Sequence, residues 1–411
     1  MSSKLGRTVV VTGWGAVSAY GWGVQHLANV FSGKAPAPYY GINANGTAKV
    51  LKSASDSKAL SQLMLKEGTS YIKRRANMSI FATSQAMHMA RLNSSEVGLL
   101  GWGSGLNATG VSVDAYQSMI LQQHNLPRDK SAPSVPISWD DVSTTGIAAW
   151  AGLDCPVMTY LNTCASSAVA IGEAMFAISQ GRCSSAIVGG SESFIESSVF
   201  STPSSNAEAL HREHTHHSSD IQFTAAKKCS SMVLGEGAAC MILESESHAL
   251  KRGAHILAYC LGYAQVSDPD CMRKSRAEPK LRTMYSALQQ AGVSTNDVSY
   301  VNAHSFIEQN RNSSEIDALN SLFGDTHTLV SSTKGATGHL MGASGAIEAI
   351  IAINALRFKK CPPNFAVRKL DPRIRFNAPL KPTALRSGDV CLSNSFSVGG
   401  TNVSLVFKAH Y

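Results

Sequence analysis

Two segments of the chain share one pattern, and this repetition limits the possible folds more than any other feature of the sequence. Residues 157–178 and 328–353 each run from a short apolar stretch through a polar turn into a helix of small residues. Each is followed by another strand-like segment, at 185–193 and 391–400, that ends in glycines or a polar turn. The pattern indicates a duplicated α/β unit. In such a duplication the equivalent loops of both halves meet around a shared cleft.

The rest of the chain alternates short β-branched runs with Ala-rich helical stretches, which indicates an α/β protein with buried, largely parallel strands. A boundary is expected near residue 250, so that residues 1–250 and 251–411 form two halves. The Gly-rich residues 13–21 are expected to form a turn after the first strand. Strands are expected at residues 7–12, 156–161, 185–193, 256–264, 298–304, 326–332 and 390–396, and a helix at 165–180.

Composition restricts the class of protein. With 411 residues and 44% hydrophobic content, the chain can bury a large core and is too long for one ordinary domain. No apolar run approaches the roughly 20 residues that cross a bilayer, and the first residues lack the apolar core of a signal peptide. We therefore expect a cytoplasmic protein without a membrane span. Nine cysteines without a CxxC pair indicate reduced thiols rather than a disulfide framework.

The charge indicates what kind of partner the chain binds. A net charge of +8 favours acidic partners, which include nucleic acid, an anionic membrane surface and an acidic carrier protein. The sequence has no interleaved aromatic and basic residues of the kind that bind RNA, so nucleic acid is disfavoured. The segment His211–His217 has a metal-like density of histidines, but it lacks strand or helix framing. We interpret it as a solvated loop and expect no metal site.

Cys164 stands where a predicted strand ends and a helix begins. Free backbone N–H groups and the positive end of the helix dipole favour a thiolate at such a position. The small residues Ala165, Ser166 and Ser167 that follow allow a substrate to approach. A buried, inert thiol is the ordinary interpretation of a cysteine, and the other eight cysteines keep it. We predict that Cys164 is a nucleophile.

Two histidines are predicted to face this cysteine from the other half of the chain. His304 ends a strand in the sequence VNAH, and His339 ends the polar turn STKGATGH before a Gly-rich helical segment. At equivalent rims of the cleft, they form a Cys-His-His set with Cys164. Two imidazoles suit a reaction that holds a thioester carbonyl and stabilises the negative charge developing on it.

An ordered set of short motifs extends from one end of the chain to the other. The chain resembles the elongating β-ketoacyl-acyl carrier protein synthases, of the synthase I/II type, and their polyketide relatives. Thiolases pair the nucleophilic cysteine with a second cysteine, and initiating synthases pair it with an asparagine. The resemblance implies a thiolase-like fold, a pseudo-duplicated αβαβα arrangement of five layers that dimerises through its N-terminal half. The motifs are VVVTGWGAVSAYG, NTCASSAVAIGEA, VLGEGAA, VNAH, STKGATGHLMGASGAIEA and NSFSVGGTN.

The resemblance also implies a reaction. Cys164 is expected to accept an acyl chain from the phosphopantetheine thiol of an acyl carrier protein. His304 and His339 are then expected to bind the thioester carbonyl of a malonyl carrier and to promote its decarboxylation. The resulting enolate attacks the acyl group on Cys164, which yields CO2 and a β-ketoacyl carrier. The reaction requires no cofactor.

Further residues match the family's functional positions. The backbone N–H groups of Cys164 and Val398 match the oxyanion hole. Lys334 matches the lysine that tunes the histidine site, and Glu348 matches the glutamate that organises it. Phe396 and Val398 match the acyl gate, where the family's second aromatic residue is replaced by Val398.

Other positions depart from the family. After the first histidine the family reads HGTSTPxxD, where two threonines bind the pantetheine arm, whereas this chain reads HSFIEQNRN. Phe306 and Glu308 therefore stand where those hydroxyl groups belong. Upstream of the GEG motif, the family's PFDxxRDGF is replaced by TAAKKCSSMV. These departures favour specialised metabolism over housekeeping fatty acid synthesis.

Two alternatives to an active synthase stay open. The chain could be a chain-length-factor-like partner that shapes the acyl tunnel of a catalytic subunit without condensing anything itself. The lost threonines favour this hypothesis, and the complete Cys-His-His set argues against it. The turn at Gly13 and Gly15 weakly mimics a dinucleotide-binding loop, but the third glycine is missing. The sequence does not distinguish a homodimer from a heterodimer, nor a fatty acid from a polyene or aromatic polyketide product.

Overall fold

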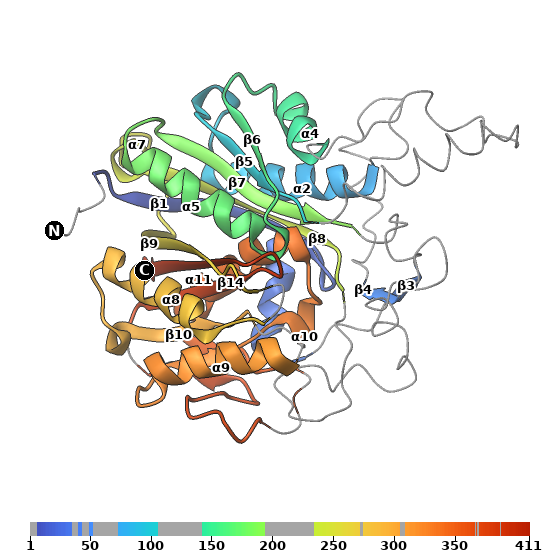
Figure 1. The fold of residues 1–411 in the computed structure, drawn as a ribbon. Coiled ribbons are helices and arrows are strands. Elements are labelled where there is room, and N and C mark those ends of the chain that lie inside the picture. Colours follow the sequence, from blue (N-terminus) through green and yellow to red (C-terminus); the bar gives the residue numbers. More distant parts are fainter. Residues whose placement is uncertain are drawn as a thin grey trace, which may run out of the picture.

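The computed structural model describes most of the chain (Figure 1). The described residues are 6–34, 40–42, 49–51, 73–105, 142–193, 234–271, 274–304, 309–365, 367, 370–386 and 388–411. Phe306, Glu308 and the loop His211–His217, to which the sequence drew attention, lie outside these ranges.

Five strands from the N-terminal half of the chain lie side by side in one sheet. They are β1 (Val9–Ser18), β5 (Leu100–Gly103), β6 (Val157–Tyr160), β7 (Ser185–Glu192) and β8 (Gly237–Ser245). Their spatial order is β1-β8-β7-β5-β6. Strand β8 is antiparallel to both of its neighbours, whereas β7, β5 and β6 are parallel to one another.

Five strands from the C-terminal half repeat this arrangement. They are β9 (Ala258–Ser267), β10 (Val298–Asn302), β11 (Leu329–Ser331), β14 (Val390–Phe396) and β15 (Thr401–Ala409). Their order is β9-β15-β14-β10-β11, and β15 is antiparallel to both neighbours while β14, β10 and β11 are parallel. Numbered along the chain, both halves have the order first, fifth, fourth, second, third. The duplication predicted from the sequence is therefore confirmed in strand order and strand direction.

The two halves are joined edge to edge. Strand β1 pairs antiparallel with β9, so that Val9–Val11 lie opposite Ala258–Cys260. Among the described helices, none is both long and apolar enough to cross a membrane. They are α2 (Lys73–Ala90), α4 (Val142–Ala151), α5 (Ser166–Ser179), α7 (Glu246–Lys251), α8 (Ala277–Ala291), α9 (Gln309–Phe323), α10 (Lys334–Thr337) and α11 (Ser344–Arg357). In the element order, helices α2, α4 and α5 precede the second, third and fourth of the five strands of the first half, as α8, α9 and α11 do in the second half; Figure 1 shows the helices against the sheet.

Short elements complete the described part of the chain. The 3-10 helices are η1 (Val24–Ser32), η2 (Ser94–Glu96), η3 (Thr163–Ala165), η5 (Thr295–Asp297) and η6 (Met341–Ala343). The short strands are β2 (Gly21–Trp22), β3 (Tyr40–Ile42), β4 (Lys49–Leu51), β12 (Lys360–Cys361) and β13 (Thr383–Ala384). Helices η3 and η6 matter most for function, because each directly precedes one of the two central helices, α5 and α11.

The hydrophobic core is divided in a way that defines five layers. One cluster joins α5 and α11 to the inner faces of both halves of the sheet. A second lies between the outer face of the first half and helices α2 and α4, and a third lies between the outer face of the second half and helices α8 and α9. Every residue of α11 from Ser344 to Leu356 is buried. A helix that is surrounded in this way is expected to be apolar on all sides, and these residues of α11 are apolar apart from Ser344, Glu348 and Asn354.

The Gly-rich segment after residue 12 is a strand and not the turn that the sequence suggested. Strand β1 continues through Gly13 and Gly15 to Ser18. A Cβ atom on Gly13 would lie 2.3 Å from the carbonyl oxygen of Ala86, and one on Gly15 would lie 2.1 Å from that of Ala82. These glycines therefore allow α2 to pack closely on the sheet. The dinucleotide-binding alternative needed a turn here, and the structure contradicts it.

Candidate active site

Two equivalent turns present the residues of the site. Strand β6 ends at Tyr160, and the chain passes through η3 into α5, with Cys164 in η3 fully buried. Thr163 has a φ of +49°, which is unusual for a β-branched residue. The turn through η6 into α11 has the same form, and Met341 at the equivalent position has a φ of +42°. The left-handed residue is therefore a property of the strand-to-helix elbow in both halves.

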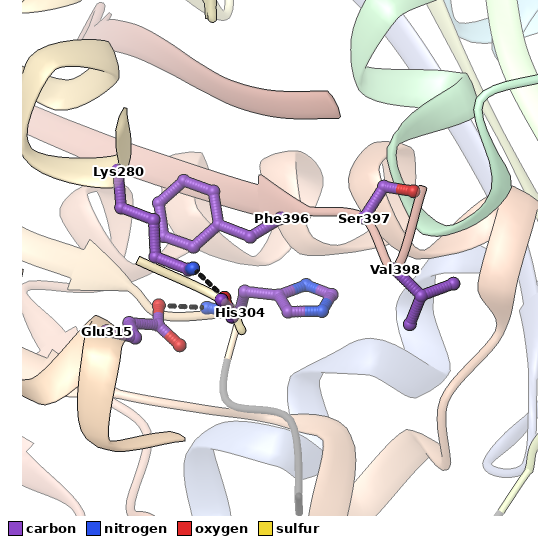
Figure 2. A pocket seen from close by; sticks show the side chains of 7 residues that line it. Lys280, His304, Glu315, Phe396, Ser397 and Val398 are labelled. Atoms are coloured by element: carbon purple, nitrogen blue, oxygen red, sulfur yellow. Dashed lines mark hydrogen bonds between the residues drawn. The ribbon is translucent and has the colours of Figure 1, made fainter. Parts of the chain in front are cut away.

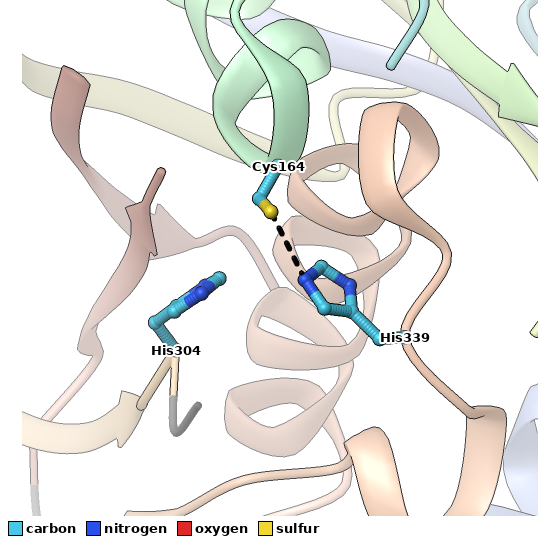
Figure 3. A group of neighbouring side chains, drawn as sticks. All are labelled: Cys164, His304 and His339. Atoms are coloured by element: carbon cyan, nitrogen blue, oxygen red, sulfur yellow. Dashed lines mark hydrogen bonds between the residues drawn. The ribbon is translucent and has the colours of Figure 1, made fainter. Parts of the chain in front are cut away.

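His339 approaches Cys164 from the second elbow (Figure 3). Its Nε2 lies 3.1 Å from the Cys164 sulfur. The backbone N–H of Met341 donates to Nδ1 over 3.1 Å, and the Ser344 hydroxyl lies 2.9 Å from the same atom. Because Nδ1 accepts a hydrogen bond from an amide, we assign the ring proton of the neutral imidazole to Nε2. His339 therefore directs an N–H donor at the position of the Cys164 sulfur.

Burial lowers the pKa of His339 well below its usual value, and the positive charge of Lys334 lowers it further. His339 is thus neutral at physiological pH, which matches the tautomer assigned above. The same arrangement does not suit a metal ion, although a thiolate and two imidazoles are common metal ligands. To bind a metal, His339 Nε2 would have to lose the proton that its hydrogen bonds place there.

His304 completes the cluster. It follows the end of β10 and is 2% exposed. Its ring centroid lies 5.5 Å from that of His339, with the ring planes at 78°. The Cys164 sulfur and one ring nitrogen of each histidine all lie within 4.8 Å of one another. The structure thus brings together the three side chains that the sequence singled out from three distant segments.

The sequence suggested that the elbow position favours a thiolate at Cys164. The structure shows a neutral thiol instead. Burial raises its pKa to about 11, although the charge of Lys334 and the backbone N–H groups of Val398 and Cys164 lower it. The cost of burying a charge therefore outweighs the local donors. The two N–H groups nevertheless favour the thiolate, and they are the groups that the family resemblance assigned to an oxyanion hole.

Lys334 and Glu348 form a buried ion pair behind the histidines. Lys334 begins α10 and Glu348 lies in α11, and their side chains are 4% and 1% exposed. Burial raises the pKa of Glu348 to about 7, against the attraction of Lys334. The field of the Lys334 ammonium reaches both Cys164 and His339, whose pKa values it lowers.

A small cavity opens beside His304 and is shown in Figure 2. The ring of Phe396 lies 6.2 Å from that of His304, and Val398 lies at the same wall. The two residues that match the acyl gate thus border one of the two histidines. The cavity is lined by Ser275, Lys280, His304, Glu315, Phe396, Ser397 and Val398.

Two charged residues of this cavity were not found by sequence reasoning. Glu315, on α9, accepts a hydrogen bond from the backbone N–H of His304 over 2.8 Å. Lys280, on α8, is 4% exposed, donates to the Ser275 hydroxyl, and lies 5.6 Å from the ring centroid of Phe396. Glu315 follows His304 by only 11 positions. An acidic residue on the helix directly after His304 was therefore the sequence signal that could have identified it. Lys280 has no such signal, because nothing in the sequence of α8 marks it as buried.

Comparisons with known proteins match this geometry. Residues 7–249 match the family described as β-ketoacyl synthase, N-terminal domain, and residues 257–368 match β-ketoacyl synthase, C-terminal domain. The chain is 29% identical to 3-oxoacyl-[acyl-carrier-protein] synthase 2 of Synechocystis sp., and the similarity covers 98% of each chain.

Solved structures have the same fold. A structure of the ishigamide ketosynthase/chain length factor superposes with a TM-score of 0.84 at 21% identity, over 98% of this chain and 100% of that one. A type II polyketide ketosynthase solved with its acyl carrier protein superposes with a TM-score of 0.80 at 24% identity, over 98% and 100% of the two chains. With the duplicated strand order, these likenesses show a thiolase-like α/β fold. The chain belongs to the β-ketoacyl synthase family.

Proposed function

We propose that this chain condenses an acyl group held on Cys164 with malonyl-acyl carrier protein, with loss of CO2, to give a β-ketoacyl-acyl carrier protein. The observation that carries the proposal is the buried cluster in which the Cys164 sulfur lies 3.1 Å from His339 Nε2 and within 4.8 Å of a ring nitrogen of His304. A full-length relative is named as a 3-oxoacyl-[acyl-carrier-protein] synthase, which supports the same reaction.

In the first step the Cys164 sulfur attacks the thioester carbonyl of an acyl carrier. A bond forms between this sulfur and the acyl carbon, the bond to the pantetheine sulfur breaks, and the Cys164 proton passes to the departing pantetheine sulfur. The carbonyl oxygen becomes negative as the bond forms. We assign the stabilisation of that oxygen to the backbone N–H groups of Cys164 and Val398, because both already favour the negative form of the Cys164 sulfur.

In the second step the malonyl thioester carbonyl lies against the two histidines. The bond to the carboxyl group breaks, CO2 leaves, and the electron pair forms an enolate whose oxygen accepts hydrogen bonds from the imidazoles. His339 suits this role because burial keeps it neutral with its proton on Nε2. The enolate carbon attacks the acyl group on Cys164, the carbon–sulfur bond breaks, and the released thiolate takes up a proton from water. This chemistry needs no cofactor.

Lys334 and Glu348 act behind the reacting atoms in this proposal. The Lys334 ammonium lowers the pKa of both Cys164 and His339. It therefore favours a thiolate during acyl transfer and a neutral imidazole during decarboxylation. Glu348 holds the ammonium in place through the buried ion pair. Phe396 and Val398, beside the cavity, would control access of the acyl chain.

A second candidate is a chain-length-factor-like subunit that shapes the acyl tunnel of a catalytic partner. The fold of the ishigamide ketosynthase/chain length factor is compatible with this role. The replacement of the pantetheine threonines by Phe306 and Glu308 also favours it. The intact Cys-His-His cluster favours the active synthase, because a subunit that does not condense has no chemical need for three converging groups.

The edge of the sheet favours binding of a homologous second chain, whether the protein is an active synthase or a chain-length-factor-like subunit. Strand β6 is an edge strand among the described residues, and it carries exposed apolar side chains. Leu161, just after β6, and Phe176, on α5, are exposed apolar residues as well. The exposed fractions are 41% for Val157, 45% for Met158, 51% for Leu161 and 49% for Phe176. We propose that a second ketosynthase-like chain covers this edge, as a homodimer or a heterodimer, and that acyl carrier protein delivers both substrates.

A two-part assay tests the proposal. The purified chain is incubated with acyl and malonyl carriers, alone and then with co-expressed ketosynthase candidates, while the mass of the Cys164 peptide and the β-ketoacyl product are followed. We expect acylation and condensation by the chain alone, and loss of both in the Cys164→Ala variant. An inert chain, together with an active heterodimer in which Cys164→Ala is harmless, would establish the subunit role instead.

A further inference from the structure

A pair of hydroxyl groups links the Cys164 elbow to the loop that carries Val398. The side chains of Thr163 and Ser397 are hydrogen-bonded to each other although they are 234 positions apart. Thr163 directly precedes Cys164, and Ser397 directly precedes Val398. The pair therefore joins the segment of Cys164 to the segment of Val398, whose N–H groups both lower the pKa of the Cys164 thiol. These segments belong to opposite halves of the duplicated fold.

The direction of these hydrogen bonds follows from counting protons. The Thr163 hydroxyl donates to the carbonyl of Asn162 over 2.8 Å. A hydroxyl has one proton, so Ser397 has to donate to Thr163. The Ser397 oxygen in turn accepts from the backbone N–H of Gly399 over 3.0 Å. A directed chain of hydrogen bonds thus runs from the Val398 loop into the elbow, and such chains strengthen one another.

Ser397 also shapes the loop itself. Its backbone N–H donates to the carbonyl of Thr401 over 2.8 Å, and its carbonyl accepts from the N–H of Gly400 over 3.0 Å. On the far side, the N–H of Asp268 donates to the Gly400 carbonyl over 2.8 Å, and the Cys271 thiol lies 3.4 Å from the carbonyl oxygen of Val398. The loop is thus fastened to the connection after β9, and the Thr163 hydroxyl fastens it to the elbow. Figure 2 shows Ser397 and Val398 together at the wall of the cavity.

We propose that Thr163 and Ser397 are positioning residues whose hydroxyl pair holds the Val398 N–H in register with the Cys164 N–H, so that both reach the same oxyanion. This inference rests on the proposed condensing activity. Oxyanion donors work only when they lie about 2.7–3.1 Å from the developing charge. Since the two donors come from different halves of the fold, a local link between those halves is needed to keep this spacing.

The left-handed conformation of Thr163 fits this role. A β-branched residue in this region is strained and persists where the surroundings determine its conformation strongly. Met341 adopts the same conformation at the equivalent elbow without a hydroxyl group. The elbow thus forms without the Thr163 hydroxyl, and removal of the hydroxyl is expected to leave the turn intact. A valine is the matched replacement, because it keeps the β-branch and loses only the hydrogen bond.

The test compares Thr163→Val, Ser397→Ala and the double variant with the wild type. Rates of acyl transfer to Cys164 and of condensation are measured with acyl and malonyl carriers. We expect each single variant to lower both rates by about 10- to 100-fold, with the KM for the malonyl carrier changed less than about twofold. The double variant should be no slower than the slower single variant, because both remove the same link. Thr163→Ser should restore most of the rate.

Thr144→Val is the matched control. The hydroxyl groups of Thr144 and Thr159 form another bonded pair, 2.9 Å apart, between α4 and β6. Loss of this hydroxyl pair should leave the rates of acyl transfer and condensation unchanged. It should lower thermal stability about as much as the Thr163→Val substitution does. A second readout does not need turnover: the alkylation rate of Cys164 by iodoacetamide at pH 8. Because the Val398 N–H favours the thiolate, this rate should fall in Thr163→Val and Ser397→Ala and stay unchanged in Thr144→Val.

Three outcomes would overturn the inference. They are unchanged rates in both single variants, additive losses in the double variant, and an alkylation rate that does not respond. The proposed function fails separately, if wild-type protein neither acylates Cys164 nor condenses, alone or with a partner chain. In that case a fall in alkylation would still show the structural link, but the catalytic role inferred for it would be lost.

Discussion

At the scale of single residues, burial shifts the pKa values of Cys164 and His339 in opposite directions, and both side chains become neutral. The pKa of Cys164 rises to about 11 and that of His339 falls well below its usual value, so the pair consists of a neutral thiol and a neutral imidazole. This differs from a thiolate–imidazolium pair, in which the nucleophile is ionised in advance. Acyl transfer in this chain therefore has to move the Cys164 proton as the new bond forms.

The first prediction concerns the pH dependence of Cys164 alkylation. With a pKa of about 11, about one thiol in ten thousand is ionised at pH 7, and this fraction rises tenfold per pH unit. The rate of alkylation by iodoacetamide, followed by the mass of the Cys164 peptide, should therefore rise about tenfold per unit between pH 7 and pH 10. The Cys164→Ala variant identifies the peptide. A rate that is already constant above pH 8 would contradict the raised pKa.

The second prediction concerns the ion pair of Lys334 and Glu348. Lys334→Met leaves a buried carboxyl group whose pKa, already about 7, rises further because the ammonium that lowered it is gone. A carboxyl with a raised folded-state pKa contributes stability that is complete below its unfolded value of about 4.3 and is lost as the pH rises through the folded value. Denaturation should therefore show a larger loss at pH 8, about 3–5 kcal/mol, than at pH 6.

The double variant Lys334→Met with Glu348→Gln is the control for this experiment. It has neither ionisable group at the site, so its stability should change less between pH 6 and pH 8 than that of the Lys334→Met variant. If Lys334→Met were destabilised equally at both pH values, the buried carboxyl would not be the cause.

Local sequence signals explain which site residues could be predicted. Cys164 and His304 follow strands and His339 precedes a Gly-rich helical segment, each within a recognisable motif, and the structure places them together. Their catalytic roles remain predictions. Thr163 and Ser397 have no such signal, because their contact joins segments 234 positions apart and depends on how the two halves meet.

At the scale of elements, the site depends on how closely α5 and α11 approach. A Cβ atom on Gly345 would lie 2.7 Å from both the Cβ and the backbone nitrogen of Ala168. Small residues at the first turns of these helices thus let the two elbows touch. The composition of the helices was visible in the sequence, but the reason for it was not, because the contact partner is 177 positions away. The glycines of β1 misled the sequence interpretation for the same reason.

The third prediction tests this close contact with Gly345→Ala. The added methyl group meets backbone on the facing helix, so the two helices have to separate. We expect a loss of about 1–3 kcal/mol in the free energy of unfolding, measured by denaturant titration, and slower condensation. Gly146→Ala in α4 is the matched control, since its nearest contact would be an ordinary 3.7 Å. That control should be neutral or stabilised by up to about 1 kcal/mol, and an equal loss in both variants would refute the packing argument.

At the scale of the whole molecule, two halves with one strand order are joined through β1 and β9, and the sheet ends at β6 and β11. The duplication could be predicted because the strand–turn–helix pattern occurs twice in the sequence. The strand directions could not: the sequence indicated largely parallel strands, whereas β8 and β15 run antiparallel to both of their neighbours. How the chain associates with other chains could not be predicted from the sequence, because association depends on which side chains are exposed. The apolar side chains on β6 are the part of the described surface that indicates it.

The fourth prediction concerns association through β6. Met158→Asp places a charge on the exposed edge and should convert the assembled protein to single chains, as measured by light scattering after size-exclusion chromatography. Tyr285→Asp is the control, because Tyr285 on α8 is also an exposed apolar residue, at 52%. If both variants associate like the wild type, the β6 edge is not the interface.

The two elbows have the same backbone form, but they do not tolerate the same side chains. Gly342 occupies in η6 the position that Cys164 occupies in η3. A Cβ atom on Gly342 would lie 2.5 Å from the backbone nitrogen of Gly105 and 2.6 Å from the backbone carbon of Ser104. No nucleophilic side chain fits there without moving the backbone. The second elbow is therefore restricted to glycine at the position where the first carries a thiol, so only one of the two equivalent turns can present a reactive side chain at this position.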